Sequence, residues 1–227
     1  MLEREIVNPK LIAIDGINGC GKTTLAAALV SGLKDKLGIS VELIRVPDTP
    51  FREAVFGLKD ARPEQLLLMA AAHISSYRKI RKAMQEGKWV VVDRYMASLY
   101  AYQVAGNNWE YSPGTVRYLT SSNIAWQKNC QYVRPDFYIH LNIPLDVCMK
   151  NRAVRSEARL IETDPFENIS NEFERNVAIG YHEYFSGIVD LLDAHNVIPV
   201  DYQIPPVLLA DGIIEEITNI LSTATPA

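Results

Sequence analysis

Five short runs of mainly apolar residues are spaced along the chain, and each has the length of a β-strand. The runs are LIAI (11–14), VELIRV (41–46), WVVV (89–92), FYIHLNI (137–143) and NVIPV (196–200). Apolar residues follow one another in these runs instead of alternating with polar ones. This pattern is typical of strands in a parallel sheet, because helices cover both faces of such a sheet.

Longer segments with helical periodicity lie between the apolar runs. They cover residues 21–37, 63–86, 96–105, 113–130, 144–152, 165–194 and 205–222. Ser112-Pro113 and Asp164-Pro165 each put a capping side chain before a proline suited to the first turn of a helix. The repeated alternation predicts an α/β doubly wound fold. No linker divides the chain, so we expect one domain over 1–227.

The segment 63–86 differs from the other predicted helices, because EQLLLMAAAHIS is apolar around its whole circumference. A helix of this kind is buried on all sides. In a chain of 227 residues, its outer side is expected to face a partner subunit. The alternative is a helix that lies wholly inside one subunit.

The composition is that of a globular protein and gives no sign of a membrane-spanning or secreted one. Hydrophobic residues make up 48% and charged residues 22%, as in ordinary globular domains. The net charge of −4 gives no reason to expect binding to nucleic acid or to an anionic membrane. The three cysteines lack metal-binding spacing and suggest reduced thiols in the cytoplasm. The N-terminus resembles no signal peptide, and no apolar run reaches the ~20 residues that span a bilayer.

The stretch GINGCGKT (16–23) fits the phosphate-loop pattern G-x-x-x-x-G-K-[ST], with a predicted strand before it and a helix after it. In such a loop, backbone N–H groups and the positive end of the helix face phosphate oxygens. The lysine reaches the terminal phosphates and the threonine hydroxyl binds Mg²⁺. A glycine turn that matches by chance is the alternative. The loop therefore predicts ATP binding by Gly16, Asn18, Gly19, Cys20, Gly21, Lys22, Thr23 and Thr24.

A second group of polar residues follows the strand WVVV, in the order Asp93, Arg94, Tyr95. Ligands of open α/β sheets lie beyond the carboxyl ends of the strands, so these residues are expected beside the phosphate loop. Asp93 can hold a metal-bound water, and Arg94 can clamp the phosphate of an acceptor with two hydrogen bonds. A surface ion pair at the end of a strand is the alternative.

At this point the chain resembles the thymidylate kinase family. DGINGCGKTT, DRY and SLYAYQ occur in the family's order and at compatible spacing. The turn RVP (45–47) and the stretch RPDFYIHLNIP (134–144) resemble further family motifs. The resemblance covers nearly the whole chain. It implies a three-layer phosphate-loop kinase fold with a five-stranded parallel sheet, and Mg²⁺-dependent transfer of the γ-phosphoryl group of ATP to a nucleoside monophosphate.

The resemblance also implies residue roles. Arg94, helped by Arg45, would bind the acceptor phosphate, and Tyr102 would lie against the acceptor sugar unless it is a core aromatic residue. Family members are usually homodimers, consistent with the helix at 63–86. The full set expected near the acceptor is Asp15, Asn18, Arg45, Leu68, His73, Arg94, Ser98 and Tyr102.

The basic segment KNRAVRSEAR (150–159) is expected to belong to a lid at about 151–163. The phosphate loop itself carries no arginine, so a lid arginine would stabilise the charge that develops on the transferred group. We expect Arg155 and Arg159 to have this catalytic role, together with Lys22 and Arg94, and Arg152 to pack on the adenine. An exposed basic helix end is the alternative.

The chain departs from the family pattern on the acceptor side. Asn18, Val46 and Asn142 replace common acidic residues, and Leu68 and Ala72 stand where the family has an aromatic residue and an arginine that read thymine. A site without such groups discriminates weakly between bases. We therefore expect the acceptor to be a nucleotide other than dTMP, a broader set of monophosphates that could include dTMP, or a modified nucleotide.

Two other functions remain open at the level of sequence. One is a kinase whose acceptor carries a free hydroxyl, with Asp15 or Asp93 as the base. The other is a nucleotide-binding regulator with little ATPase activity. Arg94 and Arg45 look matched to an acceptor phosphate and argue against the first alternative. The complete lysine–threonine loop and the arginine-rich lid argue against the second.

Overall fold

A computed structural model describes residues 8–58, 62–108, 110, 112, 132–158, 170–187, 196–198, 200 and 204–223. Five strands form one sheet in the order β2-β3-β1-β4-β5, and every neighbouring pair is parallel. The strands are β1 (Leu11–Gly16), β2 (Val41–Arg45), β3 (Trp89–Asp93), β4 (Phe137–Leu141) and β5 (Asn196–Ile198). The parallel sheet confirms the fold class that the continuous apolar runs predict, because residues 11–14 of the central strand β1 have no exposed surface.

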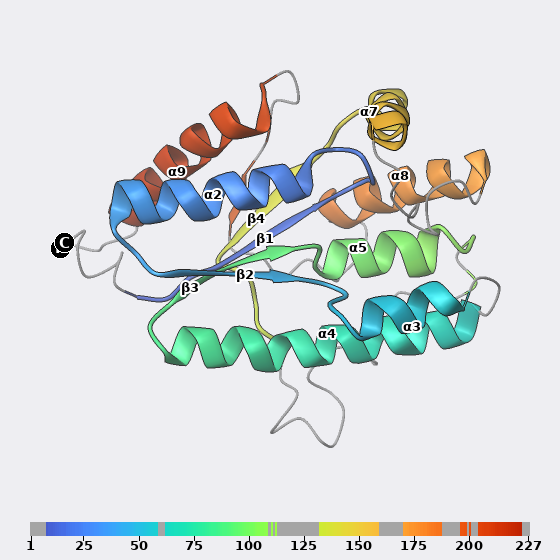
Figure 1. Cartoon of the computed structure of the whole chain (residues 1–227), viewed down its shortest axis with the longest axis horizontal. Coiled ribbons are helices and arrows are strands. Elements are labelled where there is room, and N and C mark those ends of the chain that lie inside the picture. The colour runs from blue at the N-terminus through green and yellow to red at the C-terminus, as the bar shows by residue number, and fades with distance from the viewer. Residues whose placement is uncertain are drawn as a thin grey trace.

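Helices cover both faces of the sheet, which gives three layers (Figure 1). They are α2 (Lys22–Leu37), α3 (Phe51–Gly57), α4 (Arg62–Gln85), α5 (Met96–Tyr100), the π-helical turn η1 (Ala101–Ala105), α7 (Leu145–Ala158), α8 (Asn171–Phe185) and α9 (Pro206–Thr223). Helices α2 and α9 lie together on one face, and α4, α5 and α8 lie on the other.

Most predicted helices are found close to their expected bounds. The sequence did not predict α3, which has only seven residues, nor the π-helical form of η1. Helix α7 runs six residues beyond the predicted end at 152 and includes the described part of the expected lid. The predicted helix at 113–130 and the expected helix start at Asp164-Pro165 lie outside the described residues. The bounds predicted for the helix at 165–194 are wrong, because Ser170 has an extended backbone and caps α8, and Gly187, with φ 74°, follows the end of α8 at Phe185.

Helix α4 is buried along much of its length, but not on every side. Leu66, Ala72 and Tyr77 are buried, whereas Leu67 is 57% exposed and Ala71 is half-buried. The helix is therefore not wholly internal to one chain.

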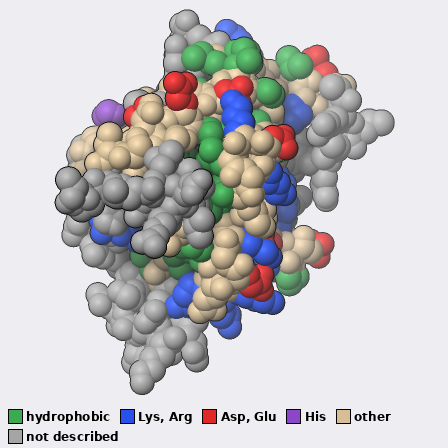
Figure 2. Space-filling model, turned by 90° about the vertical axis from the view of Figure 1, so that its left-hand side faces the viewer, with side chains coloured by type: hydrophobic (Ala, Val, Ile, Leu, Met, Phe, Trp, Pro, Cys, Tyr) green, Lys and Arg blue, Asp and Glu red, His purple; other side chains and the backbone are tan. Residues whose placement is uncertain are grey.

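The face at the amino ends of the strands carries charges of both signs. Figure 2 shows basic and acidic side chains mixed on this face. Lys36 of α2 pairs with Asp211 of α9 at 2.8 Å, and Lys88 pairs with Glu86 at 2.8 Å. Among the helices of the described part of the chain, none is long and apolar enough to cross a membrane.

Candidate active site

The phosphate loop (16–23) joins β1 to α2, and its backbone depends on glycine at two positions. Gly19 has φ 89° and Gly21, the N-terminal cap of α2, has φ 93°, in the left-handed region that other residues avoid. A Cβ atom on Gly19 would also collide with the carbonyl oxygen of Cys148 in α7. The loop can therefore turn sharply and lie directly against α7.

Lys22 is held inside this loop. Its Nζ atom donates hydrogen bonds to the carbonyl oxygens of Gly16 at 2.7 Å and Ile17 at 2.8 Å. It also lies 3.5 Å from the thiol of Cys20. Burial lowers the pKa of the Lys22 ammonium, since the charged form is the one that loses solvation. The cation is thus fixed at the centre of the loop that the sequence assigns to phosphate.

Thr23 and Asp93 meet beside the loop, although 70 residues separate them. The hydroxyl of Thr23 donates to Oδ2 of Asp93 at 2.7 Å, and Nε of Arg45 donates to the same oxygen at 3.2 Å. The second carboxylate oxygen, Oδ1, is buried and has no hydrogen-bond partner in the described part of the chain. A hydroxyl and an unsatisfied carboxylate oxygen are ligands that suit Mg²⁺.

Within the residues that the structure describes, no three His, Cys, Asp or Glu side chains cluster as in a metal site built only from protein. This arrangement fits Mg²⁺, which is commonly held by one or two carboxylates together with substrate phosphates and water.

Arg94, Asn18 and Tyr102 converge at the tip of the loop. The guanidinium of Arg94 donates to Oδ1 of Asn18 and lies 5.6 Å from the centre of the Tyr102 ring. The backbone N–H of Asn18 donates to the Tyr102 hydroxyl at 3.0 Å. The Nδ2 atom of Asn18 is buried and has no hydrogen-bond partner among the described residues. Three predicted acceptor residues are therefore in mutual contact.

Asp15 and Ser98 lie behind Arg94 and are buried. Ser98 donates to Oδ1 of Asp15, which also accepts the backbone N–H of Tyr95 at 3.0 Å. Burial raises the pKa of the Asp15 carboxyl, and these hydrogen bonds oppose that shift. The hydrogen bonds of Asp15 and Ser98 described here are thus internal to the protein, and direct contact with an acceptor stays a prediction.

Leu68 and His73 lie on α4 in different surroundings. Leu68 is half-buried against the core, while His73 has no exposed surface and packs against Tyr77 and Tyr95, with ring centres 6.4 and 6.1 Å away. Neither ring nitrogen of His73 has a hydrogen-bond partner in the described residues, and burial lowers its pKa to about 3. Its expected role toward an acceptor stays a prediction.

Helix α7 carries the arginines that the sequence assigns to the lid. Arg152 is buried and forms an ion pair with Glu174 of α8 at 2.7 Å. Arg155 is exposed near the C-terminal end of α7. Arg159 and residues 159–163 of the expected lid lie outside the described residues. The catalytic and adenine-binding roles of these arginines stay predictions.

The sequence analysis missed one contact with the phosphate loop. The side-chain amide of Asn151 donates to the carbonyl oxygen of Gly19 at 3.0 Å. Cys148, Asn151 and Arg152 have the i, i+3, i+4 spacing of one helix face, and Cys148 and Arg152 also lie close to Gly19. This spacing is visible in the sequence, but only the fold brings this face of α7 to the loop.

A family model described as thymidylate kinase matches residues 14–199. The chain belongs to the thymidylate kinase family. It is 35% identical to the thymidylate kinase of Methylococcus capsulatus over 179 residues, covering 76% of this chain and 79% of that protein. The thymidylate kinase of Bordetella pertussis is 33% identical over 184 residues, covering 77% and 80%. That of Thermomicrobium roseum is 31% identical over 219 residues, covering 92% and 95%.

Membership of the thymidylate kinase family confirms the resemblance that the ordered motifs indicate. It also confirms the class of enzyme: the chain is a phosphotransferase, a nucleoside monophosphate kinase. The two alternative functions, a kinase of free hydroxyl groups and a non-catalytic regulator, receive no support from these relatives.

Proposed function

We propose that this enzyme transfers the γ-phosphoryl group of ATP to the phosphate of a nucleoside monophosphate, and that dTMP is one of several acceptors. The observation that carries the proposal is the meeting of two sets of residues at the carboxyl end of the sheet. Lys22, Thr23 and Asp93 form one set, and Arg94 with Asn18 forms the other. The first set suits a triphosphate and the second suits an acceptor phosphate.

On the ATP side, backbone N–H groups of the phosphate loop and the N-terminal end of α2 bind the phosphates, and Lys22 neutralises the terminal ones. Thr23 and Asp93 would hold Mg²⁺, Asp93 through a bound water. Mg²⁺ supplies positive charge that offsets the charge on the phosphates during transfer. The Thr23–Asp93 contact at 2.7 Å supports this assignment, since it keeps both oxygen ligands together.

On the acceptor side, Arg94 binds the phosphate and Arg45 assists. Arg45 donates to Asp93 at 3.2 Å and its side chain is 46% exposed, so it lies between the metal ligand and solvent. The Tyr102 ring lies beside Arg94 and supports a role next to the acceptor sugar. No general base is required, because a phosphate oxygen of the acceptor is already anionic near neutral pH.

The lid contributes the remaining positive charge. Arg155 and Arg159 would approach the transferred group when the site closes, as charge spreads over its equatorial oxygens. Adenine would pack on the planar face of the Arg152 guanidinium. The edge of this guanidinium is held by the carboxylate of Glu174, with 2.7 Å between nitrogen and oxygen. The contact of Asn151 with Gly19 supports coupling between α7 and the phosphate loop.

The side chains of α4 that are expected near the acceptor base suggest weak discrimination between bases. Leu68 and Ala72 offer only aliphatic surface, and Ala72 is 1% exposed, so neither can hydrogen-bond to the edge of a pyrimidine. A pocket without fixed hydrogen-bonding groups rejects a wrong base less strongly than one that has them. This supports a broad range of acceptors.

The test is an acceptor panel in an assay of ADP release with ATP and Mg²⁺. We expect dTMP and at least one other monophosphate among dUMP, dCMP, dAMP, dGMP and UMP to have kcat/KM values within about 100-fold of each other. If dTMP exceeds every other acceptor by more than that, the broad-acceptor proposal is wrong. If no monophosphate stimulates ADP release, phosphoryl transfer to a monophosphate is wrong as well.

We further propose that the enzyme is a cytoplasmic homodimer that uses α4. The apolar side chain of Leu67, which is 57% exposed, and the half-buried Ala71 support this surface, because a second subunit would cover them. The two described cysteines, Cys20 and Cys148, are free thiols, which is compatible with a reducing compartment.

A further inference from the structure

The backbone of Arg94 adopts a conformation that an arginine rarely takes. Its φ angle is 74°, in the left-handed region, and only one other described non-glycine residue, Asn108, has a positive φ. Such a conformation persists only where the surroundings hold it in place. Here the chain turns abruptly between the end of β3 and the start of α5, and this turn directs the Arg94 side chain towards Asn18.

Two hydrogen bonds donated by backbone N–H groups hold this turn, one just before and one just after the Cα atom of Arg94. The N–H of Arg94 donates to the carbonyl oxygen of Ile14 at 3.0 Å. The next N–H, that of Tyr95, donates to the carboxylate of Asp15 at 3.0 Å. Both acceptors belong to β1. Because the second acceptor is the side chain of Asp15, the position of Arg94 depends on how that side chain is oriented.

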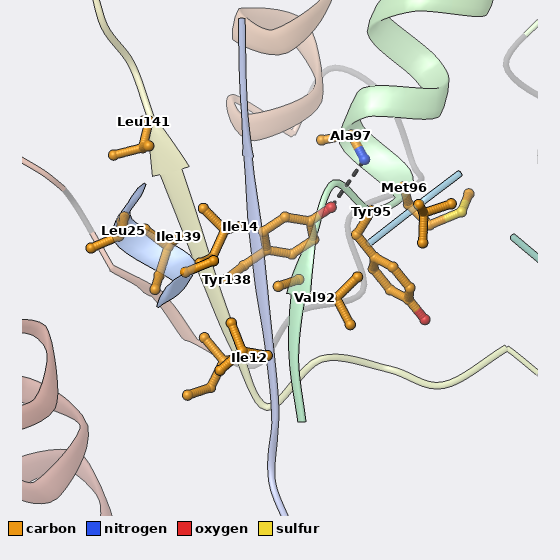
Figure 3. Packing of buried hydrophobic residues seen from close by; sticks show 14 of the residues in the cluster. Ile12, Ile14, Leu25, Val92, Tyr95, Met96, Ala97, Tyr138, Ile139 and Leu141 are labelled. Carbon is orange, nitrogen blue, oxygen red and sulfur yellow. Dashed lines mark hydrogen bonds between the residues drawn. The ribbon is translucent and has the colours of Figure 1, made fainter. Parts of the chain in front are cut away.

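Tyr138 of β4 orients Asp15 and holds the start of α5. Its hydroxyl donates to Oδ2 of Asp15 at 2.5 Å, and the hydroxyl oxygen of Tyr138 accepts the backbone N–H of Ala97 at 3.0 Å. Figure 3 shows the Tyr138 ring reaching past β1 to the N–H of Ala97. Helix α5 has no side-chain cap of its own, so this tyrosine takes the place of a local N-terminal cap.

The surroundings of Tyr138 fix its ring and keep its hydroxyl protonated. The side chain is fully buried, and Phe185 of α8 packs edge-on against the ring at 5.1 Å. Burial, with the negative charge of Asp15 beside it, raises the pKa of the Tyr138 hydroxyl well above its ordinary value. The hydroxyl therefore stays protonated at neutral pH and can donate to Asp15.

We propose that Tyr138 is a positioning residue for the acceptor: through Asp15 and the first turn of α5, its hydroxyl keeps Arg94 in the conformation that binds the acceptor phosphate. This inference rests on the proposed role of Arg94. The chain of contacts runs from Tyr138 to Asp15, from Asp15 to the N–H of Tyr95, and from there to Arg94. Tyr138 itself does not touch substrate in this scheme.

The test compares Tyr138→Phe with Tyr100→Phe. Both changes remove one hydroxyl from a buried tyrosine, but the Tyr100 hydroxyl bonds to Glu183 of α8 at 2.9 Å and not to Asp15. In Tyr138→Phe we expect the acceptor KM to rise about tenfold, the effect of losing a hydrogen bond to a charged group, with the ATP KM unchanged. Tyr100→Phe should change neither KM value.

A double-mutant cycle shows whether Tyr138 acts through Arg94. Arg94→Ala should raise the acceptor KM by itself, and adding Tyr138→Phe should then raise it no further. If Arg94→Ala leaves the acceptor KM unchanged, the role proposed for Arg94 fails. If Arg94→Ala raises the acceptor KM and Tyr138→Phe does not, the inference about Tyr138 is overturned while the role of Arg94 stands. The same holds if the increases in acceptor KM from the two single variants multiply in the double variant.

Thermal unfolding of each variant separates positioning from folding. A purely structural tyrosine would lower Tm in Tyr138→Phe and leave both KM values unchanged, and that result would also overturn the inference. Should Tyr138→Phe be unfolded at the assay temperature, Asp15→Asn provides the second measurement. It keeps the shape of the side chain and removes its charge, so it should raise the acceptor KM and show the same loss of effect with Arg94→Ala.

Discussion

At the scale of single residues, the ammonium of Lys22 is tightly held. It is bound to two carbonyl oxygens of its own loop, and its side chain is buried among loop atoms. A group held in this way loses little freedom when a phosphate binds, so most of its charge is available to the transferred group.

Replacing Lys22 tests this role directly. We expect Lys22→Met, which keeps the length of the side chain but not its charge, to lower kcat by about 10²–10³-fold. The readout is ADP release at saturating ATP and acceptor. Lys34→Met, in the last turn of α2 and away from the loop, is the matched control and should retain full activity. Unchanged turnover in Lys22→Met would contradict the assignment of the loop.

His73 contributes to the loss of stability in acid. The folded state keeps its imidazole neutral down to a pKa of about 3, whereas the unfolded chain takes up a proton near 6.5. Because the unfolded state binds more protons below pH 6.5, stability is highest above that pH and falls as the pH drops towards 3. The slope from one such group is about 1.4 kcal/mol per pH unit.

This dependence can be tested by measuring the free energy of unfolding in urea at pH 7 and at pH 5. His73→Leu should flatten the loss of unfolding free energy between these two pH values, and His182→Gln, at an exposed histidine of α8, should leave most of it in place. His140, whose pKa is lowered to about 4 by burial and by the charge of His182, contributes the same dependence in the wild type and in His73→Leu. Equal slopes in the wild type and His73→Leu would show that His73 takes up its proton in the folded state.

At the scale of elements, α7 and α8 are joined by a buried ion pair. Arg152 and Glu174 are 2.7 Å apart, with side chains 9% and 7% exposed. Removing one partner leaves the other charge buried, which usually costs more than the pair contributes.

We therefore expect Arg152→Met to lower the free energy of unfolding by about 3–5 kcal/mol. The double variant Arg152→Met with Glu174→Leu should recover most of that loss, because no unpaired charge remains. Chemical denaturation of the three proteins gives the answer. If the single and double variants are equally unstable, the loss comes from packing of the arginine stem and not from the unpaired carboxylate.

The sequence predicted most elements but not all, and the misses have physical reasons. The strands β1 and β3 begin with uninterrupted apolar runs, so their type and first residues are evident from the sequence, but each strand continues past its run to include Asp15 or Asp93. Helix α3 follows Pro50 and has only seven residues, which is too short for a periodic pattern to stand out. The π-helical turn η1 packs against α8, and no local pattern distinguishes it from an α-helix.

At the scale of the whole molecule, α4 has one side on the core and another side that is exposed. One side of α4 packs on the core through Ile80 and Tyr77, which have no exposed surface. The other side includes Leu67, which is 57% exposed. An exposed leucine in the apolar first half of α4 is the feature on which the proposed dimer depends.

We expect Leu67→Glu to shift the protein from dimer to monomer in sedimentation velocity experiments, since the change puts a charge into the proposed interface. Leu208→Glu is the matched control, because Leu208 of α9 is equally exposed at 63% and lies on the opposite face of the sheet. If the wild type is a monomer, the proposed dimer is wrong. If the dimer persists in Leu67→Glu and dissociates in Leu208→Glu, the interface does not use α4.

The sequence by itself determined the phosphate loop, the parallel sheet and the family, because each is written in local patterns: a glycine spacing, apolar runs and ordered motifs. Only the tertiary structure joined Asp15 to Tyr138, 123 residues away, and Arg152 to Glu174, 22 residues away. A buried polar side chain must find its partner wherever the fold brings one, so such pairs leave no periodic signal in the chain.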